Sequence, residues 1–391
     1  MRHPERLPSL TFQMHPRARK LVGMLSGSRI EPASLDLADW TQIVALAAEQ
    51  GVAPVLRSRL KDSGAVPPPE AALQLREAYL ANVALNMRLL RERDRILVAL
   101  RAAQISVIPI KGASFAEALY GDSALRPMAD IDLWVQRSHL DDARAVMRTL
   151  GYASRAKVDR PPALQDVLTG ETQMVRPSGP LVELHWNLFP GEWLRHTARV
   201  DERTIWERSR PRDGEQVREL SPEDAIIHLC VHLAVNHQMS GIGLRTLVDL
   251  DYARREWAVD WAVVAQRARL WRVSCATWLV LNALAALLGD PEHELPLPAL
   301  EPSPWRRRMI NRFASPGRIA DGLALSGGPK RFLLLLLLVD RPKDALLLIW
   351  RAAFPERLWL TLRHERPNAA GVRLWLLHAK HLLRMAATRE P

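Results

Sequence analysis

The sequence predicts an α+β protein that is predominantly helical, with one small mixed β-sheet between two helical regions. Apolar residues recur at helical spacing over most of the first hundred residues and again after residue 221. Short apolar runs bounded by turn residues gather between residues 105 and 189. We therefore divide the chain into an N-terminal helical region (1–103), an α/β core (104–220) and a C-terminal helical region (221–391).

The N-terminal region is expected to contain helices alone. Residues 36–60 have apolar residues at helical spacing, and either Asp36 or Asp39 can begin that helix. A loop rich in proline follows at residues 64–69. Residues 70–103 are rich in Ala, Leu, Arg and Glu and predict one long helix.

The α/β core begins with a short β-branched strand at residues 105–110, which ends at a turn formed by Lys111 and Gly112. Its Pro109 favours an edge or terminal position, because proline cannot donate to a ladder of hydrogen bonds. A second strand carries Asp130. Further elements are predicted at residues 114–120 (helix), 140–150 (helix), and 173–175 with 181–186 (hairpin).

The C-terminal region returns to helical patterning. Ser221 can cap the first helix, Pro222 suits its first turn, and the acidic pair that follows complements the helix dipole. We expect two or three helices over residues 222–290 and further helices over residues 305–388.

Composition and charge restrict the class of protein. Of the 391 residues, 48% are hydrophobic and 25% charged, which is typical of a soluble globular chain. The 54 basic and 43 acidic residues leave a net charge of +11, which makes polyanions plausible partners. No run of like charges concentrates this excess, and no basic stripe interleaved with aromatic residues is visible. A nucleic-acid partner is therefore not favoured.

The two cysteines and the apolar runs indicate the compartment. Cys230 and Cys275 lie in apolar helical segments without metal-ligand spacing, so we expect reduced, buried packing residues. The longest apolar run, residues 332–339, is far shorter than the ~18 residues that a membrane span requires. We expect a cytoplasmic protein with no transmembrane span.

The chemistry of the chain centres on Asp130 and Asp132. Because strand side chains alternate, both carboxylates point to one face of the second strand, while Ile131 and Leu133 point to the other. Like charges this close raise each other's pKa unless a cation neutralises them, and hard divalent ions such as Mg²⁺ are the usual solution. The pair therefore predicts a metal site.

A third carboxylate, Glu183, lies between apolar residues in the later hairpin strand. The chain between it and Asp132 is long enough for a helix and a strand, which permits the two strands to be neighbours. Two aspartates would then hold metal ions that bridge the phosphates of a nucleotide, and Glu183 would help to hold a metal near the attacking oxygen or accept its proton.

Several segments resemble the bacterial, largely uncharacterised nucleotidyltransferase family of the DNA polymerase beta-like superfamily. The resemblance is carried by Lys111-Gly112-Ala113-Ser114, by residues 125–133 (LRPMADIDL), by Val182-Glu183-Leu184-His185-Trp186, and, in the helical region, by Ser221-Pro222-Glu223-Asp224 and Leu247-Val248-Asp249-Leu250. In the superfamily's usual first motif the glycine is followed by Gly or Ser, whereas Ala113 follows Gly112 here.

The resemblance implies a nucleotidyltransferase that moves a nucleoside monophosphate from a nucleoside triphosphate to a hydroxyl or phosphate of an acceptor. A small-molecule or peptide acceptor is favoured over nucleic acid. The implied catalytic and metal-binding residues, for Mg²⁺ or Mn²⁺, are Asp130, Asp132 and Glu183. The implied nucleotide-binding residues are Lys111, Gly112, Ser114 and Arg126, with Arg126 within reach of either a phosphate or the carboxylates.

Other residues have two readings that the sequence leaves open. His185 shares a strand face with Glu183 and could ligate a metal or orient a ligand. His228 and His232 lie one helical turn apart without the glutamate of a zinc protease, so we favour packing histidines. For Asp249, hydrogen bonds in helix packing are favoured over contact with a substrate.

Two alternatives to an enzyme in solution remain. The first is a catalytically silent, nucleotide-binding accessory protein of a biosynthetic pathway. The second is peripheral association with a membrane through the C-terminal helices, where segments around Trp350, Trp359 and Trp375 are apolar and flanked by arginine. Packing of these helices onto the protein is the favoured reading.

Overall fold

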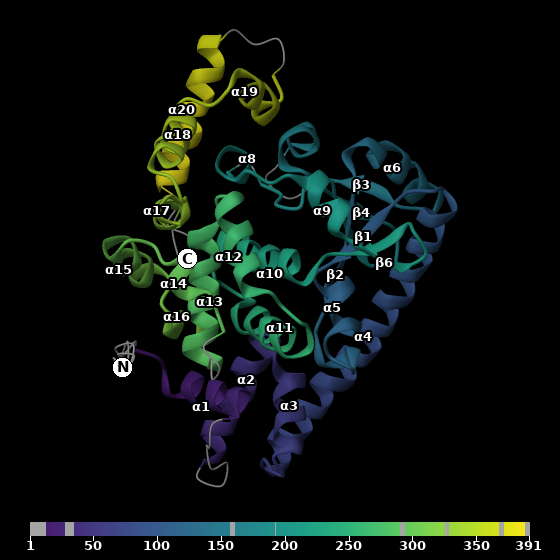
Figure 1. The fold of residues 1–391 in the computed structure, drawn as a ribbon, viewed down its shortest axis with the longest axis vertical. Coiled ribbons are helices and arrows are strands. Elements are labelled where there is room, and N and C mark those ends of the chain that lie inside the picture. The colour runs from purple at the N-terminus through teal and green to yellow at the C-terminus, as the bar shows by residue number, and fades with distance from the viewer. Residues whose placement is uncertain are drawn as a thin grey trace.

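The computed structural model describes residues 13–27, 35–156, 161–191, 193–289, 294–323, 325, 328–366 and 371–387. It confirms the predicted α+β class: the described residues form one seven-stranded mixed sheet with helical regions on either side in the sequence (Figure 1). The strand order is β3-β4-β5-β2-β1-β7-β6. The strands are β1 (Val107–Ile110), β2 (Asp130–Val135), β3 (Ala153–Arg155), β4 (Glu171–Val175), β5 (Leu181–His185), β6 (Arg210–Asp213) and β7 (Val217–Glu219).

The N-terminal region is helical, as predicted. The Asp36 side chain accepts a hydrogen bond from the backbone of Asp39, so Asp36 is the residue that caps the helix. The predicted long helix is confirmed as α4, and its second half packs against the sheet through Leu89, Ile96 and Leu100. These helices are α1 (Pro16–Ser26), α2 (Leu37–Glu49), α3 (Ala53–Asp62) and α4 (Pro69–Ala102).

The central strand β2 separates two hydrophobic cores. Ile131, Leu133 and Val135 pack into a core with α4 and α6 (Leu140–Thr149). Trp134 points to the opposite side, into a larger core shared with the N-terminal and C-terminal helices, and its ring lies 4.8 Å from that of Trp206. The alternation that the sequence predicts for this strand is therefore confirmed.

The predicted hairpin is confirmed, because β4 and β5 pair antiparallel. Of the two positions predicted for Pro109, edge or terminal, the edge position is wrong, since β1 lies between β2 and β7; Pro109 is the penultimate residue of β1. Within β1 only Val107 pairs with β7, and it donates its N–H to the Gln216 carbonyl. Pro109 has the same backbone orientation two residues later, beyond the paired stretch, so its missing N–H removes no ladder hydrogen bond.

The C-terminal region contains more helices than we expected. Instead of two or three, residues 222–290 form four α-helices and one π-helical segment, because an almost continuous apolar pattern hides breaks that contain no proline. These elements are α10 (Pro222–Val231), η5 (His232–Asn236), α11 (Gly243–Glu256), α12 (Trp261–Leu270) and α13 (Ser274–Leu288). Ser221 caps α10 as predicted. Cys230 and Cys275 are buried and form no disulfide, also as predicted.

Smaller elements connect and extend these regions. Between the strands lie α5 (Gly112–Ala118), η2 (Ser123–Leu125), η3 (Arg137–His139), α7 (Pro162–Leu164), η4 (Gln165–Thr169), α8 (Leu194–Thr197) and α9 (Glu202–Arg208). After α13 come α14 (Leu297–Leu300), α15 (Pro304–Phe313), α16 (Pro316–Ala320), α17 (Gly328–Leu338), α18 (Pro342–Ala353), α19 (Arg357–His364) and α20 (Gly371–Ala387). Among the described residues, none of the helices combines the length and apolarity needed to cross a bilayer.

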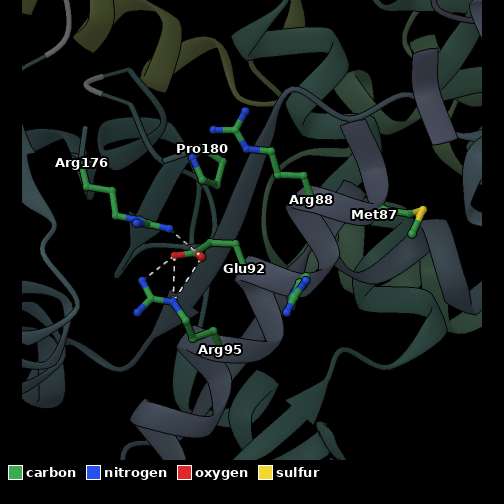
Figure 2. Close-up of a pocket in the computed structure, with 7 residues that line it drawn as sticks. Met87, Arg88, Glu92, Arg95, Arg176 and Pro180 are labelled. Atoms are coloured by element: carbon green, nitrogen blue, oxygen red, sulfur yellow. Dashed lines mark hydrogen bonds and ion pairs between the residues drawn. The ribbon is translucent and has the colours of Figure 1, made fainter. Parts of the chain in front are cut away.

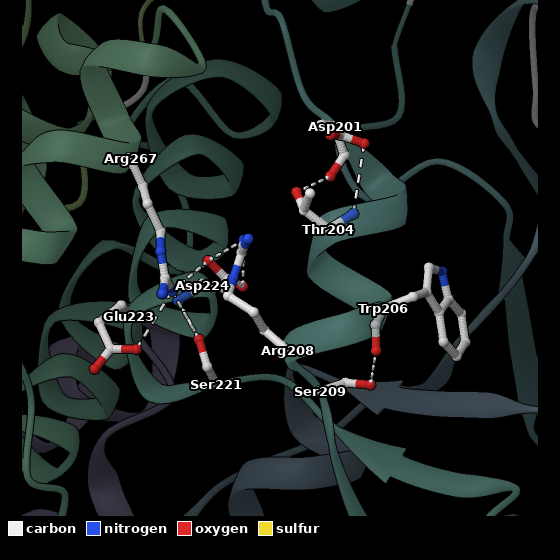
Figure 3. Close-up of polar contacts among 9 residues, drawn as sticks. All are labelled: Asp201, Thr204, Trp206, Arg208, Ser209, Ser221, Glu223, Asp224 and Arg267. Carbon is white, nitrogen blue, oxygen red and sulfur yellow. Dashed lines mark hydrogen bonds and ion pairs between the residues drawn. The ribbon is translucent and has the colours of Figure 1, made fainter.

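A buried carboxylate joins the α/β core to the C-terminal helices (Figure 3). Asp224, at the start of α10, is fully buried and accepts hydrogen bonds from Arg208 of α9 and Arg267 of α12. The shortest contacts are 3.0 Å from Arg208 and 2.8 Å from Arg267. Because both cations contact this one carboxylate, Asp224 links the three helices, and Arg267 adds a longer contact to Glu223 at 3.4 Å.

The substitution Asp224→Asn should lower the free energy of unfolding by about 2–4 kcal/mol, because it removes the carboxylate that pairs with Arg208 and leaves Arg267 only its longer contact to Glu223, in a largely buried place. The matched control is Asp213→Asn, since Asp213 forms an ion pair of similar length with Arg101 but is mostly exposed. That change should cost less than about 1 kcal/mol. Urea unfolding of both variants tests the difference, and equal losses would contradict the role given to Asp224.

Candidate functional site

The predicted carboxylates lie on adjacent strands of the sheet. β2 and β5 pair in parallel, and Asp132 is directly opposite Glu183 in the register. Asp130 is opposite Leu181, two residues earlier on the same face of β2. The expectation that Glu183 lies on a strand next to the aspartates is confirmed.

The three donors that lie closest together are Asp132, Glu183 and His185. One ligand atom of each lies within 4.8 Å of the others, and all three side chains are buried. Asp130 is not part of this group and is only partly buried. The strand pairing thus brings together two of the three predicted carboxylates and adds a histidine.

Lys111 supplies a positive charge directly beside these groups. Its ammonium lies 2.8 Å from Asp132 Oδ1, and its side chain is 12% exposed. The residue lies between β1 and α5 and has a φ of 52°, a left-handed value that few residues other than glycine adopt. The lysine therefore points into the carboxylate site from an unfavourable backbone conformation.

His185 is held between carboxylates. Its Nε2 lies 2.9 Å from Asp132 Oδ1, and its Nδ1 lies 3.5 Å from Glu171 Oε2. Gln173 of β4 donates to Glu183 Oε1 at 3.1 Å. Since Nε2 of the ring bonds to Asp132 and one oxygen of Glu183 accepts from Gln173, these contacts orient the two central carboxylates.

The clustered charges shift the pKa values in opposite directions. Burial and the neighbouring Asp132 raise the pKa of Asp130 to about 6. Burial alone would raise the pKa of Asp132, but the Lys111 ammonium and His185 outweigh it and hold that pKa well below its ordinary value. The same carboxylates raise the pKa of Lys111 against the effect of its own burial. At neutral pH the centre of the site is an ionised pair of Lys111 and Asp132.

Gly112 occupies a position with no room for a side chain. A Cβ atom there would lie 2.5 Å from a guanidinium nitrogen of Arg126 and 2.9 Å from Cγ of Met128. The glycine is thus required for close packing of α5 against the loop before β2.

Ser114 lies in the first turn of α5. Its backbone N–H donates to the Lys111 carbonyl, and its side chain lines a small cavity of about 100 Å³. That cavity includes Pro109, Glu219 and Trp257 but none of the predicted metal ligands. Of the other predicted site residues, Ser114 thus contacts Lys111 through the backbone, and none of the three predicted carboxylates lines its cavity.

Arg126 is engaged by Asp249 of α11. Its Nε and one terminal nitrogen each donate to an Asp249 carboxylate oxygen at 2.9 Å, and the pair is buried. Tyr120 donates to the same carboxylate at 2.5 Å. These contacts agree with the favoured reading of Asp249 as a packing residue. They also place the Arg126 guanidinium against a helix rather than on the central carboxylates.

Three residues near the site had no place in the sequence-based prediction. Arg245 of α11 carries a charge that acts on Asp130 and donates to the Pro127 carbonyl at 3.2 Å. Glu171 and Gln173 contact the site because β4 pairs with β5, with Glu171 opposite His185 and Gln173 opposite Glu183. The hairpin register could have identified the two β4 residues, whereas nothing local indicated Arg245.

Three histidines near the site lie in a row: His228 of α10, His232 of η5 and His237 directly after η5. The ring of His232 lies 6.0 Å from that of His228 and 4.5 Å from that of His237. Burial and the nearby Lys111 charge lower the pKa of His228 to about 3 and that of His237 to about 4. The row is therefore uncharged at neutral pH, and none of its members belongs to the group of closely spaced metal donors found among the described residues.

A separate basic cavity of about 460 Å³ lies between α4 and the β4–β5 hairpin (Figure 2). At its centre the buried Glu92 accepts hydrogen bonds from Arg95 at 2.8 Å, from Arg176 at 2.9 Å and from Tyr152 at 2.9 Å. Burial alone would raise the pKa of Glu92, but these donors lower it. No predicted metal ligand lines this cavity, so it is distinct from the carboxylate site.

The substitution Gly112→Ala should lower the stability by about 1–3 kcal/mol, because Arg126, held by Asp249, has no room to move away from the added methyl group. Gly371→Ala is the matched control, since a Cβ there meets nothing within 4 Å. Thermal unfolding followed by circular dichroism measures both. An unchanged melting temperature for Gly112→Ala would show that the added methyl group fits, and would contradict the close packing described for Gly112.

Comparison with known proteins agrees with this geometry. No curated protein and no solved structure gives a significant match to the chain. A family described as uncharacterised nucleotidyltransferase matches residues 36–289, which is more than half of the chain and includes the whole carboxylate site. The chain therefore belongs to this nucleotidyltransferase family.

Proposed function

We propose that the protein is a divalent-metal-dependent nucleotidyltransferase that uses Asp130, Asp132 and Glu183 to transfer a nucleoside monophosphate. The donor would be a nucleoside triphosphate, and the acceptor would offer a hydroxyl or phosphate group on a small molecule or peptide. The observation that carries the proposal is the direct pairing of Asp132 with Glu183 on adjacent parallel strands, in a buried group with His185.

The donor set suits a hard divalent cation. Asp132 and Glu183 present carboxylate oxygens within a small space, and Asp130 adds a third carboxylate at its border. His185 already points its Nε2 at Asp132, so we assign it to orienting that ligand rather than to holding the metal. A bound Mg²⁺ or Mn²⁺ would neutralise phosphate charge and favour departure of pyrophosphate.

The chain's own residues would then position the reactants. An acceptor oxygen attacks the α-phosphorus, the bond from that phosphorus to the bridging oxygen breaks, and pyrophosphate leaves with the bond electrons. Glu183 would take the proton of an attacking hydroxyl. Lys111 is the charged group beside the carboxylates that would contact a phosphate, and Gly112 allows the chain to pack closely at the turn.

The variants Asp132→Asn and Glu183→Gln should each lower nucleotidyl transfer at least ~100-fold, because each removes a carboxylate charge that the proposed chemistry requires. Transfer of a labelled nucleotide to acceptors in extracts of the source organism measures this, and Mn²⁺ binding measured by electron paramagnetic resonance gives a readout independent of turnover. Asp213→Asn, an exposed acid on β6, is the control and should change neither.

Transfer that persists in a protein carrying both Asp132→Asn and Glu183→Gln would refute the assignment. If the unchanged protein binds nucleotide in a calorimeter but shows no transfer with any extract, the alternative of a catalytically silent accessory protein is correct instead.

A further inference from the structure

The C-terminal helices α18 and α20 expose large apolar side chains on one face each. In α18 the exposed residues are Leu346, Ile349 and Trp350, and Phe354 follows directly after the helix. The spacing of three, one and four residues places all of them on the same side. In α20 the exposed residues on one face are Val372, Trp375, Leu376 and Leu383.

These two faces join into one surface, which we call the apolar strip. The Phe354 ring lies 4.4 Å from the ring of Trp350 and 5.8 Å from the ring of Trp375, so aromatic contacts connect α18 to α20. Exposed fractions in the strip range from 39% for Trp375 to 74% for Val372. A contiguous exposed surface of this kind marks an interaction site.

The opposite faces of the same helices are packed. Leu348 of α18 and Leu374 of α20 are almost completely buried, and His378 contacts the Ala352 carbonyl at 3.0 Å. Asp344 of α18 also forms an ion pair with Arg272 in the body of the protein, at 3.1 Å. The helices are thus held in place on one side, which leaves the strip as the outward side.

The strip is accompanied by an excess of positive charge. Between residues 341 and 383 the acidic residues are Asp344, Glu356 and Glu365, whereas the basic ones are Arg341, Lys343, Arg351, Arg357, Arg363, Arg366, Arg373 and Lys380. Two of the three acids are already neutralised, since Asp344 pairs with Arg272 and Glu356 with Arg195 and Arg351. The net charge around the strip is therefore strongly positive.

We propose that the apolar strip of α18 and α20 docks onto an anionic phospholipid surface. Amphipathic helices with Trp and Leu on one face and Arg and Lys around it lie in the headgroup region of such a surface, where both the apolar area and the cations are stabilised. Pairing of two copies through this strip would bring two positive surfaces together and is disfavoured for that reason.

The position of the strip suits a docking element. Figure 1 shows α18, α19 and α20 stacked at one end of the molecule, away from the sheet that carries the carboxylates. All three helices lie outside residues 36–289, the part that the nucleotidyltransferase family shares. Docking through the strip would therefore leave the proposed catalytic site uncovered, and the proposal does not depend on the reaction that the site performs.

The test is sedimentation of the full chain with vesicles of phosphatidylcholine alone and of an equal mixture with phosphatidylglycerol. We expect binding to the mixed vesicles that weakens with added salt, and much weaker binding to phosphatidylcholine. The triple variant Leu346→Ser, Trp350→Ser and Leu376→Ser should bind the mixed vesicles at least ~10-fold less tightly, because it removes three apolar groups from the proposed contact.

The matched control replaces three apolar residues of similar exposure elsewhere, Leu73, Val98 and Leu270, with serine and should bind like the unchanged protein. Equal far-ultraviolet circular dichroism of the two variants shows that both fold. Absence of binding to mixed vesicles, or equal binding by the strip variant, overturns the proposal. So does a dimer in solution that the strip variant alone dissociates, since a second copy would then be the occupant.

Discussion

The parallel pairing of β2 with β5 is the constraint on which the candidate site depends. It sets Asp132 beside Glu183 in a buried place, where two negative charges cannot persist without compensation. The compensating charge is the ammonium of Lys111. Lys111 comes directly after β1, the third strand, which lies on the other side of β2. The charges of Lys111, Asp132 and Glu183 therefore connect three adjacent strands, and the position of each strand depends on the other two.

The helical regions hold this arrangement through buried ion pairs rather than through apolar packing alone. Arg126, in the loop before β2, forms an ion pair with Asp249 of α11. Asp224 of α10 forms ion pairs with Arg208 and Arg267. Each buried carboxylate here engages side chains from a distant part of the chain, so these contacts specify which helix face meets the core. The orientation of the C-terminal helices relative to the sheet follows from these pairs.

Features set by local rules could be predicted from the sequence. Strand alternation put Asp130 and Asp132 on one face, the cap residues located Asp36 and Ser221, and the hairpin followed from its turn. The role of each site residue in catalysis stays a proposal. The partner of Arg126 could not be predicted from local patterns, because its pairing with Asp249 is decided by how α11 packs against the sheet. The number of helices after residue 221 was also missed, since their breaks lack proline and glycine signals strong enough to interrupt the apolar pattern.

Position 111 is subject to two opposing requirements. Its backbone dihedral is one that glycine would adopt with less strain, at a difference of about 1–3 kcal/mol. A glycine, however, would leave the Asp132 carboxylate facing Glu183 without an internal cation. Folding stability and local neutrality therefore favour different residues at the same place. With lysine at this position, the backbone strain at the end of β1 is accompanied by a cation that is always present beside the Asp132 carboxylate.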